Sequence, residues 1–232
     1  MKRVYKAVTV VPADDGGWSV ALDGRPMRTP AKNPMAVPTQ ALATAIAAEW
    51  NAQQDEIKPT TMPLTRLAAT AIDRTSPQRA EIVNDVAGYA GTDLLCYRAE
   101  HPPALAARQE ATWQPLIDWA SSRYDAGLAV TAGIIPMPQS PAALRAFAAA
   151  VAALDDFRLT GLCNLTAACG SLVIGLAVME GRLDAAAAFA ISQLDETFQI
   201  EAWGADAEAM QRRAGLAADI RSTAHFIELL NR

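Results

Sequence analysis

The stretch "LTGLCNLTAACGSLVIGLAVM", residues 159–179, decides between the two main kinds of fold open to this chain. It runs for 21 residues without a charge, which is about the length of a helix that crosses a membrane. Two Thr, three Gly, one Ser and Asn164 dilute its apolar content, and this composition suits contact with protein better than contact with lipid. Gly170, Ser171 and Gly175 are small enough to let neighbouring helices approach closely. We therefore predict a buried central helix and no membrane insertion.

Helical patterns surround this central stretch. A short pattern over residues 65–75 is followed by another over 77–90, and Ser76 is predicted to cap the start of the second helix. Residues 102–124 predict a longer helix with a kink or a join at Pro115. Further helical stretches are predicted near 140–153, 156–180, 183–203 and 205–230.

The beginning of the chain follows a different pattern. Residues 4–11 and 17–22 are short β-rich runs, and "PADDGG" between them supplies the turn residues of a hairpin. Thr39 predicts the cap of a helix over residues 40–54. A small sheet with a helix laid on it is therefore expected here.

These patterns predict an α+β, predominantly helical fold with two domains. Residues 1–58 form the small β-rich domain, and residues 59–232 form the larger α-helical domain. An extended segment at 128–135 interrupts the helices and could pair with the N-terminal sheet.

Composition excludes several classes of function. The net charge of −5 and the pI near 5.1 argue against nucleic-acid binding, because phosphate recognition requires clustered Lys and Arg. The three cysteines form no C-x-x-C pair, and with only His101 and His225 in the chain they lack the spacing of a metal site. We expect reduced, buried thiols and no bound metal.

Catalytic machinery is also missing from the sequence. Two histidines offer few bases for a nucleophile. The spacing of Gly170 and Gly175 resembles a phosphate loop, but Leu176 occupies the position of the required Lys. Glu196 and Glu201 diverge by about 140° around a helix, which disfavours a shared acid–base site. We expect no catalytic residues, no cofactor and no small-molecule substrate.

The stretch "SQLDETFQIEAWG", residues 192–204, has two different faces when it is wound as a helix. Leu194 and Phe198 lie on one face, while Glu196, Ile200 and Trp203 lie nearly opposite. Trp beside a charged group is typical of a protein contact. An internal helix covered on both faces would show the same pattern, so both interpretations stay open.

Several stretches together resemble the Atp12 family of chaperones, which assist assembly of the F1 sector of ATP synthase. They occur in the family's order and span nearly the whole chain. Asn51 and Gln114 stand where acidic residues are common in the family. The matching stretches are "LDGRPMRTP" (22–30), "VPTQALATAIAAEWNAQ" (37–53), "MPLTRLAATAID" (62–73), "GTDLLCYRAE" (91–100), "WQPLIDW" (113–119), "GSLVIGLAV" (170–178) and "SQLDETFQIEAWGADAEA" (192–209).

The resemblance implies a function in binding. Such a chaperone binds the unassembled F1 α subunit, shields the surface that a β subunit later covers, and leaves as the α/β hexamer forms. No basic presequence opens the chain, so the resemblance implies a bacterial member in the cytoplasm; an organellar mature form would act in the mitochondrial matrix. Two alternatives remain, a permanent subunit of a larger complex and a carboxylate-dependent enzyme.

The resemblance also directs attention to particular residues as partner contacts. Glu196, Ile200 and Trp203 are expected to form part of the docking face for the α subunit. Glu201 either contacts the client or pins the end of its helix. Asp93 and Arg98 offer a second candidate patch, with an internal salt bridge between them as the alternative.

Overall fold

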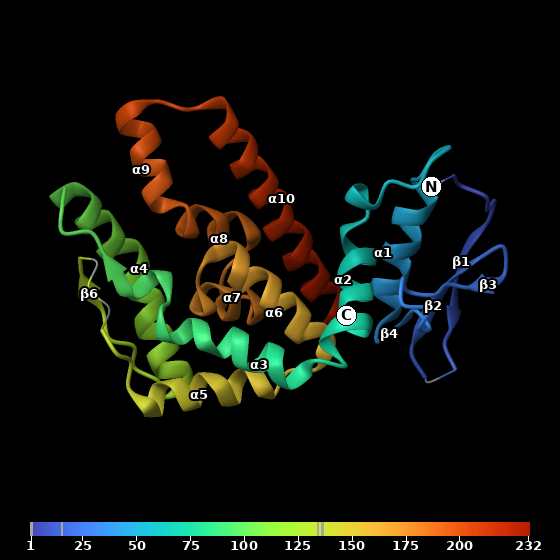
Figure 1. Cartoon of the computed structure of the whole chain (residues 1–232), viewed down its shortest axis with the longest axis horizontal. Coiled ribbons are helices and arrows are strands. Elements are labelled where there is room, and N and C mark those ends of the chain that lie inside the picture. The colour runs from blue at the N-terminus through green and yellow to red at the C-terminus, as the bar shows by residue number, and fades with distance from the viewer. Residues whose placement is uncertain (1, 15, 134, 136) are drawn as a thin grey trace. The chain divides into compact units, whose positions relative to one another are not determined.

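A computed structural model describes residues 2–14, 16–133, 135 and 137–232 of the chain (Figure 1). The chain divides into two compact units, each described here by itself. The first comprises Met1–Arg79, Asp155–Gly161 and His225–Arg232, and the second comprises Ala80–Leu154 and Leu162–Ala224. The unit that contains the sheet therefore extends beyond residue 58 and takes in two segments from much later in the sequence.

The first unit is built on a small antiparallel sheet. Strands β1 and β2 form the predicted hairpin, in which Val8 lies opposite Leu22 and Pro12 lies opposite Trp18. Asp15 of the predicted turn lies outside the described residues. Two short strands, β3 and β4, both pair with β2. The strands are β1 (Val8–Pro12), β2 (Trp18–Leu22), β3 (Arg25–Pro26) and β4 (Ala36–Val37).

Helix α1 (Gln40–Asn51) contributes to the core of this unit. Its predicted cap is confirmed, because the Thr39 hydroxyl accepts a hydrogen bond from the Leu42 amide at 3.2 Å. The same hydroxyl donates to the Leu229 carbonyl at 2.7 Å, so the C-terminal segment belongs to this core. The buried side chains include Val20, Val37, Leu42, Ile46, Leu64, Ala68, Phe226 and Leu229.

The two helical stretches predicted over 65–75 and 77–90 are present, but the cap predicted at Ser76 is wrong. Helix α2 (Pro63–Thr70) continues through a π-helical turn, Ala71–Thr75, on the way to α3 (Arg79–Gly88). Ser76 keeps helical dihedral angles and its amide donates to the Ala71 carbonyl at 3.0 Å. Residues 76–78 form a turn that separates the π-helical turn from α3.

The second unit is helical, as predicted. After α3, its helices surround α7, in which every residue from Leu172 to Val178 is buried. The prediction of a buried central helix is thus confirmed. The helices that lie wholly in this unit are α4 (Pro103–Tyr124), α5 (Pro141–Ala152), α7 (Leu172–Met179), α8 (Ala185–Ser192) and α9 (Leu194–Trp203), as Figure 1 shows. Two more helices are shared with the first unit: α6 (Asp156–Cys169) begins there and α10 (Ala207–Leu230) ends there.

The single helix predicted over 156–180 is two helices. Gly170 takes a φ of +66°, a left-handed conformation that ends α6 and that favours glycine. Ser171 then caps α7 by accepting from the Ile174 amide at 3.0 Å. A sequence pattern based on apolar content could not detect this corner, because the residues on both sides of it are equally apolar.

The sequence left open whether the extended segment near residue 130 pairs with the N-terminal sheet, and its described strand has a different partner. Strand β6 (Thr131–Ala132) pairs in parallel with β5 (Tyr97–Arg98) inside the second unit. Ile134 lies outside the described residues.

Pro115, where a kink or a join was predicted, lies within α4, and the helix continues through it. None of the helices in the described parts of the chain is long and apolar enough to cross a membrane.

Candidate protein-docking site

The candidate site is built on α9, which begins immediately after α8. The single helix predicted over 183–203 divides at Gln193, whose φ of −108° and ψ of 26° turn the chain between the two helices. The Gln193 side chain makes no capping hydrogen bond to α9 within the described structure. The direction of α9 is therefore set by what contacts its sides.

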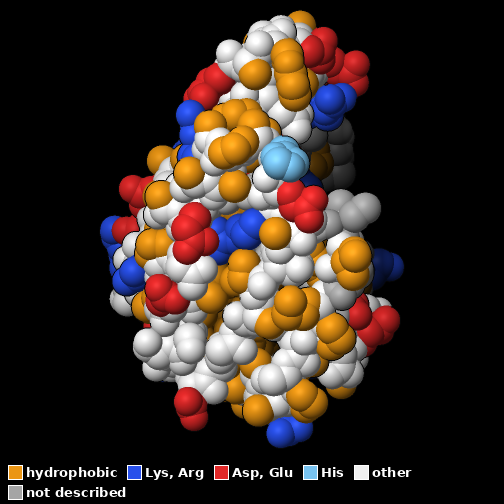
Figure 2. All heavy atoms as spheres, turned by 90° about the vertical axis from the view of Figure 1, so that its left-hand side faces the viewer, with side chains coloured by type: hydrophobic (Ala, Val, Ile, Leu, Met, Phe, Trp, Pro, Cys, Tyr) orange, Lys and Arg blue, Asp and Glu red, His pale blue; other side chains and the backbone are white. Residues whose placement is uncertain are grey.

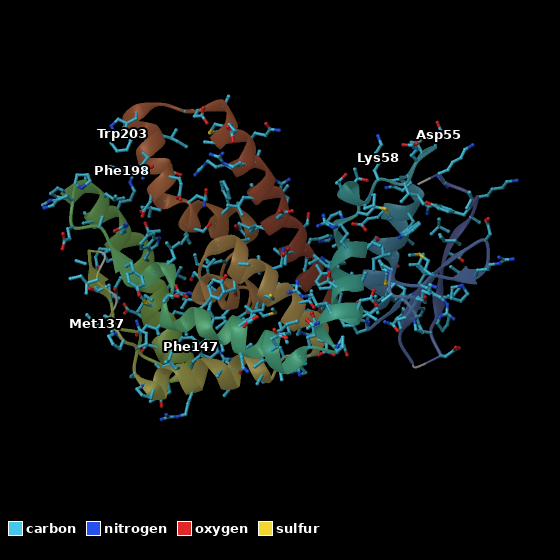
Figure 3. The ribbon with its side chains drawn as sticks, in the orientation of Figure 1. Asp55, Lys58, Met137, Phe147, Phe198 and Trp203 are labelled. Carbon is cyan, nitrogen blue, oxygen red and sulfur yellow. The ribbon has the colours of Figure 1, made fainter. Side chains whose placement is uncertain are left out.

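One side of α9 packs against α4. Leu194 is buried there, and the Asp195 carboxylate accepts a hydrogen bond of 2.8 Å from the side-chain amide of Gln109. Further along, Arg108 forms a salt bridge of 2.8 Å with Glu201 and lies 5.3 Å above the Phe198 ring. The position of Phe198 towards α4 can be followed in Figure 3.

The opposite side of α9 borders an open hollow of about 610 Å³ between α9 and α10. Glu196, Ile200 and Trp203 line it from α9, and Leu216 lines it from α10. Trp203 is 81% exposed at the outer end of α9 (Figure 3). The full lining is Gln193, Glu196, Gln199, Ile200, Trp203, Gly204, Asp206, Ala209, Arg212, Arg213 and Leu216.

Arg213 on α10 closes the inner end of the hollow. Its guanidinium donates to the Gln193 side chain at 3.1 Å and to the Thr197 hydroxyl at 2.9 Å. It also lies 5.2 Å from the centre of the Phe189 ring. Because both hydrogen-bond acceptors are neutral, Arg213 holds α9 to α10 by a forked contact and not by an ion pair.

The outer end of the hollow is formed by the turn between α9 and α10. Gly204 ends α9 with a φ of +89°. The Asp206 carboxylate then accepts from the Ala209 amide at 2.8 Å at the start of α10. Arg212 pairs with Glu208 at 2.7 Å, whereas no described residue bonds to the carboxylate of Glu196.

The structure therefore groups three of the four contact residues predicted on α9 and separates the fourth. Glu196, Ile200 and Trp203 share the hollow, and α10 does not cover Trp203. Glu201 lies on the other side of α9, where its salt bridge with Arg108 ties the end of the helix to α4. The two glutamates diverge, as their spacing in the sequence predicts.

The surface patch predicted at Asp93 and Arg98 is not formed, because both side chains are buried. Asp93 is wholly inaccessible and accepts hydrogen bonds of 3.1 Å from the amides of Leu95 and Val173. Burial raises the pKa of the Asp93 carboxyl to about 6, against the opposing effect of its hydrogen bonds. This residue joins the start of a short 3-10 helix, Leu94–Cys96, to the start of α7.

Arg98 is 7% exposed and has different partners. It donates to the Gln109 carbonyl at 2.7 Å and to the Gln114 side chain at 3.3 Å, and it lies 5.3 Å from the centre of the Trp113 ring. The alternative of a salt bridge with Asp93 is wrong as well, since the carboxylate that pairs with Arg98 is that of Glu110 at 3.9 Å. Burial lowers the pKa of the Arg98 guanidinium.

Two residues of the site escaped the sequence interpretation. Arg213 gives no signal in a single sequence, because charged residues are ordinary on a helix. Gln109 does give one: it lies four residues from both Leu105 and Trp113, within the apolar stripe of α4. An amide in such a stripe indicates a buried polar contact.

The surface around α9 mixes apolar and charged side chains. Figure 2 shows separate groups of hydrophobic side chains among acidic and basic ones on the side that faces left in Figure 1. The large hydrophobic side chains that are most exposed in the second unit are Trp203, Ile135, Met210 and Met137. Within the described ranges, no group of three or more His, Cys, Asp or Glu residues is arranged to hold a metal ion.

These features define a predominantly helical protein with a small sheet and an exposed aromatic side chain on α9. Residues 2–121 match the family model described as ATP12 chaperone protein. The chain belongs to this family of chaperones, which act in ATP synthase assembly.

Known structures and a curated relative agree with this assignment. The crystal structure of Atp12 from Paracoccus denitrificans is 47% identical, with a TM-score of 0.95 over 99% of this chain and 98% of that one. The Atu1473 protein of Agrobacterium tumefaciens is 39% identical, with a TM-score of 0.95 over 99% and 86% of the two chains. The mitochondrial protein atp12 of Schizosaccharomyces pombe is 24% identical over 215 residues, which cover 88% of this chain and 74% of that protein.

Proposed function

We propose that this chain binds the unassembled α subunit of F1-ATPase through the hollow side of α9. Membership in the ATP12 chaperone family supports a role in assembly. The observation that carries the choice of surface is the 81% exposure of Trp203 at the edge of a hollow that Ile200 and Glu196 also line. A large aromatic side chain left in water is an anchor for a protein partner.

The chemistry of the hollow indicates what it takes from the client. Ile200, Trp203 and Leu216 offer apolar surface, and the Glu196 carboxylate beside them is available for a basic side chain. A client segment with an apolar side chain next to Lys or Arg matches both features. An unassembled α subunit exposes such partly apolar surface where it will later meet β, and this surface is prone to wrong association.

Release follows from competition. A chaperone that covers the α–β interface reversibly is displaced when a β subunit buries a larger area of the same surface. The chaperone then needs no nucleotide hydrolysis of its own. We propose that a bacterial member acts in the cytoplasm and that an organellar form acts in the mitochondrial matrix.

Size-exclusion chromatography with the purified F1 α subunit tests this function, with the β subunit as the parallel control. Wild-type protein is expected to form a complex with α alone. Glu196→Lys and Trp203→Ala, each confirmed as folded, are expected to lose it, because one reverses the free charge and the other removes the anchor.

The matched control is Glu81→Lys, which changes an exposed acid on α3 that does not line the hollow. If wild type binds neither subunit, the proposed client is wrong. If the folded Glu196 and Trp203 variants bind α like wild type, only the proposed surface is wrong. Persistent co-purification with finished ATP synthase would instead favour a permanent subunit.

A further inference from the structure

We propose that Gln109 is a positioning residue. It is held in place at β5, its side chain donates a hydrogen bond to Asp195, and this bond fixes the orientation in which α9 meets the client. The proposal rests on the proposed function of α9. It also gives the buried Arg98 a role, because the Arg98 guanidinium donates to the Gln109 carbonyl.

The first step is that the last residue of β5 and the residue after it both bind Gln109. The Arg98 guanidinium donates to the Gln109 backbone carbonyl at 2.7 Å. The backbone amide of Ala99, the next residue, donates to the Gln109 side-chain oxygen at 2.7 Å. Gln109 is 1% exposed, so water does not compete for these bonds.

The second step is that these contacts fix which way the Gln109 amide points. A backbone amide can only donate, and an ionised carboxylate can only accept. The side-chain oxygen must therefore face Ala99, and the NH₂ group must face Asp195, to which it donates at 2.8 Å. Among the natural side chains of this length, only glutamine offers an acceptor and a donor on one rigid group. Glutamate would place a second carboxylate against Asp195.

The third step is that α9 depends on such lateral contacts. Gln193 is the single residue between α8 and α9, and it does not cap α9 with its side chain in the structure as described. Asp195 lies in the first turn of α9, where a displacement moves the whole helix. Its bond to Gln109 thus fixes the base of the helix that presents Glu196, Ile200 and Trp203.

A charge-swap experiment tests this proposal. Gln109→Glu is expected to repel Asp195, to weaken binding of the F1 α subunit about tenfold, and to increase amide hydrogen exchange over residues 194–203. Adding Asp195→Asn is expected to restore both, because the new amide can donate to the new carboxylate while the Ala99 amide keeps its acceptor. Gln211→Glu, the same substitution at an exposed position of α10, is the matched control and should change neither.

The outcomes separate the two proposals. The positioning role is overturned if the Gln109→Glu variant shows the same amide hydrogen exchange and the same binding of the α subunit as the Gln211→Glu variant. It is also overturned if adding Asp195→Asn to Gln109→Glu restores neither the amide exchange nor the binding. If wild type does not bind α but the loosening of α9 and its rescue are observed, the positioning role stands and the client is wrong. If Gln109→Glu fails to fold, Asp195→Ala removes the same hydrogen bond by changing its half-buried partner. It is expected to give the same increase in amide exchange over residues 194–203.

Discussion

At the scale of single residues, exposure separates groups that serve binding from groups that serve the fold. Trp203 and Asp93 are opposite cases: the tryptophan is 81% exposed and the aspartate is wholly buried. The sequence interpretation treated both as surface contacts. The motif around Asp93 gave no indication of burial, because a carboxylate that accepts backbone amides resembles an exposed one in sequence. The alternative of a pair with Arg98 is not formed either, because Asp93 accepts from backbone amides and Arg98 donates to the Gln109 carbonyl.

Trp203→Ala is expected to change binding without changing stability. The side chain loses little packing because most of it is already in water, so the free energy of unfolding should stay within about 0.5 kcal/mol of wild type. Its loss from an interface should cost about 2 kcal/mol of binding free energy. Urea unfolding and calorimetric titration with the α subunit measure the two quantities. A drop in stability greater than about 1 kcal/mol would mean that Trp203 serves the fold.

Asp93 is expected to give the protein a pH dependence of a particular sign. Its pKa is raised by burial from 3.8 to about 6, so the folded state holds a proton that the unfolded state releases. The contribution of protonated Asp93 to stability is complete below pH 3.8 and is lost as the pH rises through about 6. Urea unfolding between pH 4 and pH 7 should show wild type losing stability relative to Asp93→Asn as the pH rises. A difference that stays constant with pH would contradict this assignment.

At the scale of elements, corners and close approaches decide how the helices are arranged. The apolar run at 159–179 was correctly predicted to be buried in protein, because its composition is too apolar to face water and too polar to face lipid. Its division at Gly170 was not predicted, since the left-handed conformation of one glycine depends on the tertiary structure and not on the local sequence. The division at Gln193 was missed for a related reason: helical periodicity continues across it. The two faces of α9 were predicted, but its contacts with α4 were not. Gln109 of α4, for example, lies 86 positions before its partner Asp195, and no local pattern links the two.

Gly175 in α7 and Gly215 in α10 are both helical glycines, but the space around them differs. A Cβ at Gly175 would lie 2.9 Å from both Leu162 Cδ1 and Thr166 Oγ1, whereas a Cβ at Gly215 in α10 would meet nothing within 4 Å. Gly175→Ala should therefore destabilise the protein by about 1–3 kcal/mol through overpacking. Gly215→Ala should stabilise it by about 0.5–1 kcal/mol through helix propensity. Thermal unfolding of both variants is the measurement, and equal shifts would show that α6 and α7 can move apart.

At the scale of the whole molecule, segments that are distant in sequence complete the same core. The hairpin of β1 and β2 and the start of α1 were predicted because they carry their own turn and cap residues. The composition of the sheet unit was not, because nothing local shows that Phe226 and Leu229 pack with Val20 and Leu42. The Thr39–Leu229 hydrogen bond joins residues 190 positions apart.

Phe226→Ala is expected to weaken the sheet unit specifically. The ring is fully buried and stacks on Phe157 at a centroid distance of 6.4 Å, so its removal should cost about 3–5 kcal/mol. Amide exchange over β1 and β2 should accelerate. Arg232→Ala, an exposed change in the same segment, should leave the exchange unaltered. If the strands keep their protection in Phe226→Ala, the C-terminal segment is not needed for this core.

The contribution of residues 225–232 to the sheet unit also constrains the order of events during translation. The hairpin and α1 are synthesised before the side chains of Phe226, Leu229 and Leu230 that close their core. The nascent sheet must therefore keep an unfinished apolar face while the residues between α1 and Phe226 are made. During its own synthesis this chaperone is thus exposed to the kind of misassociation that chaperones prevent in other proteins.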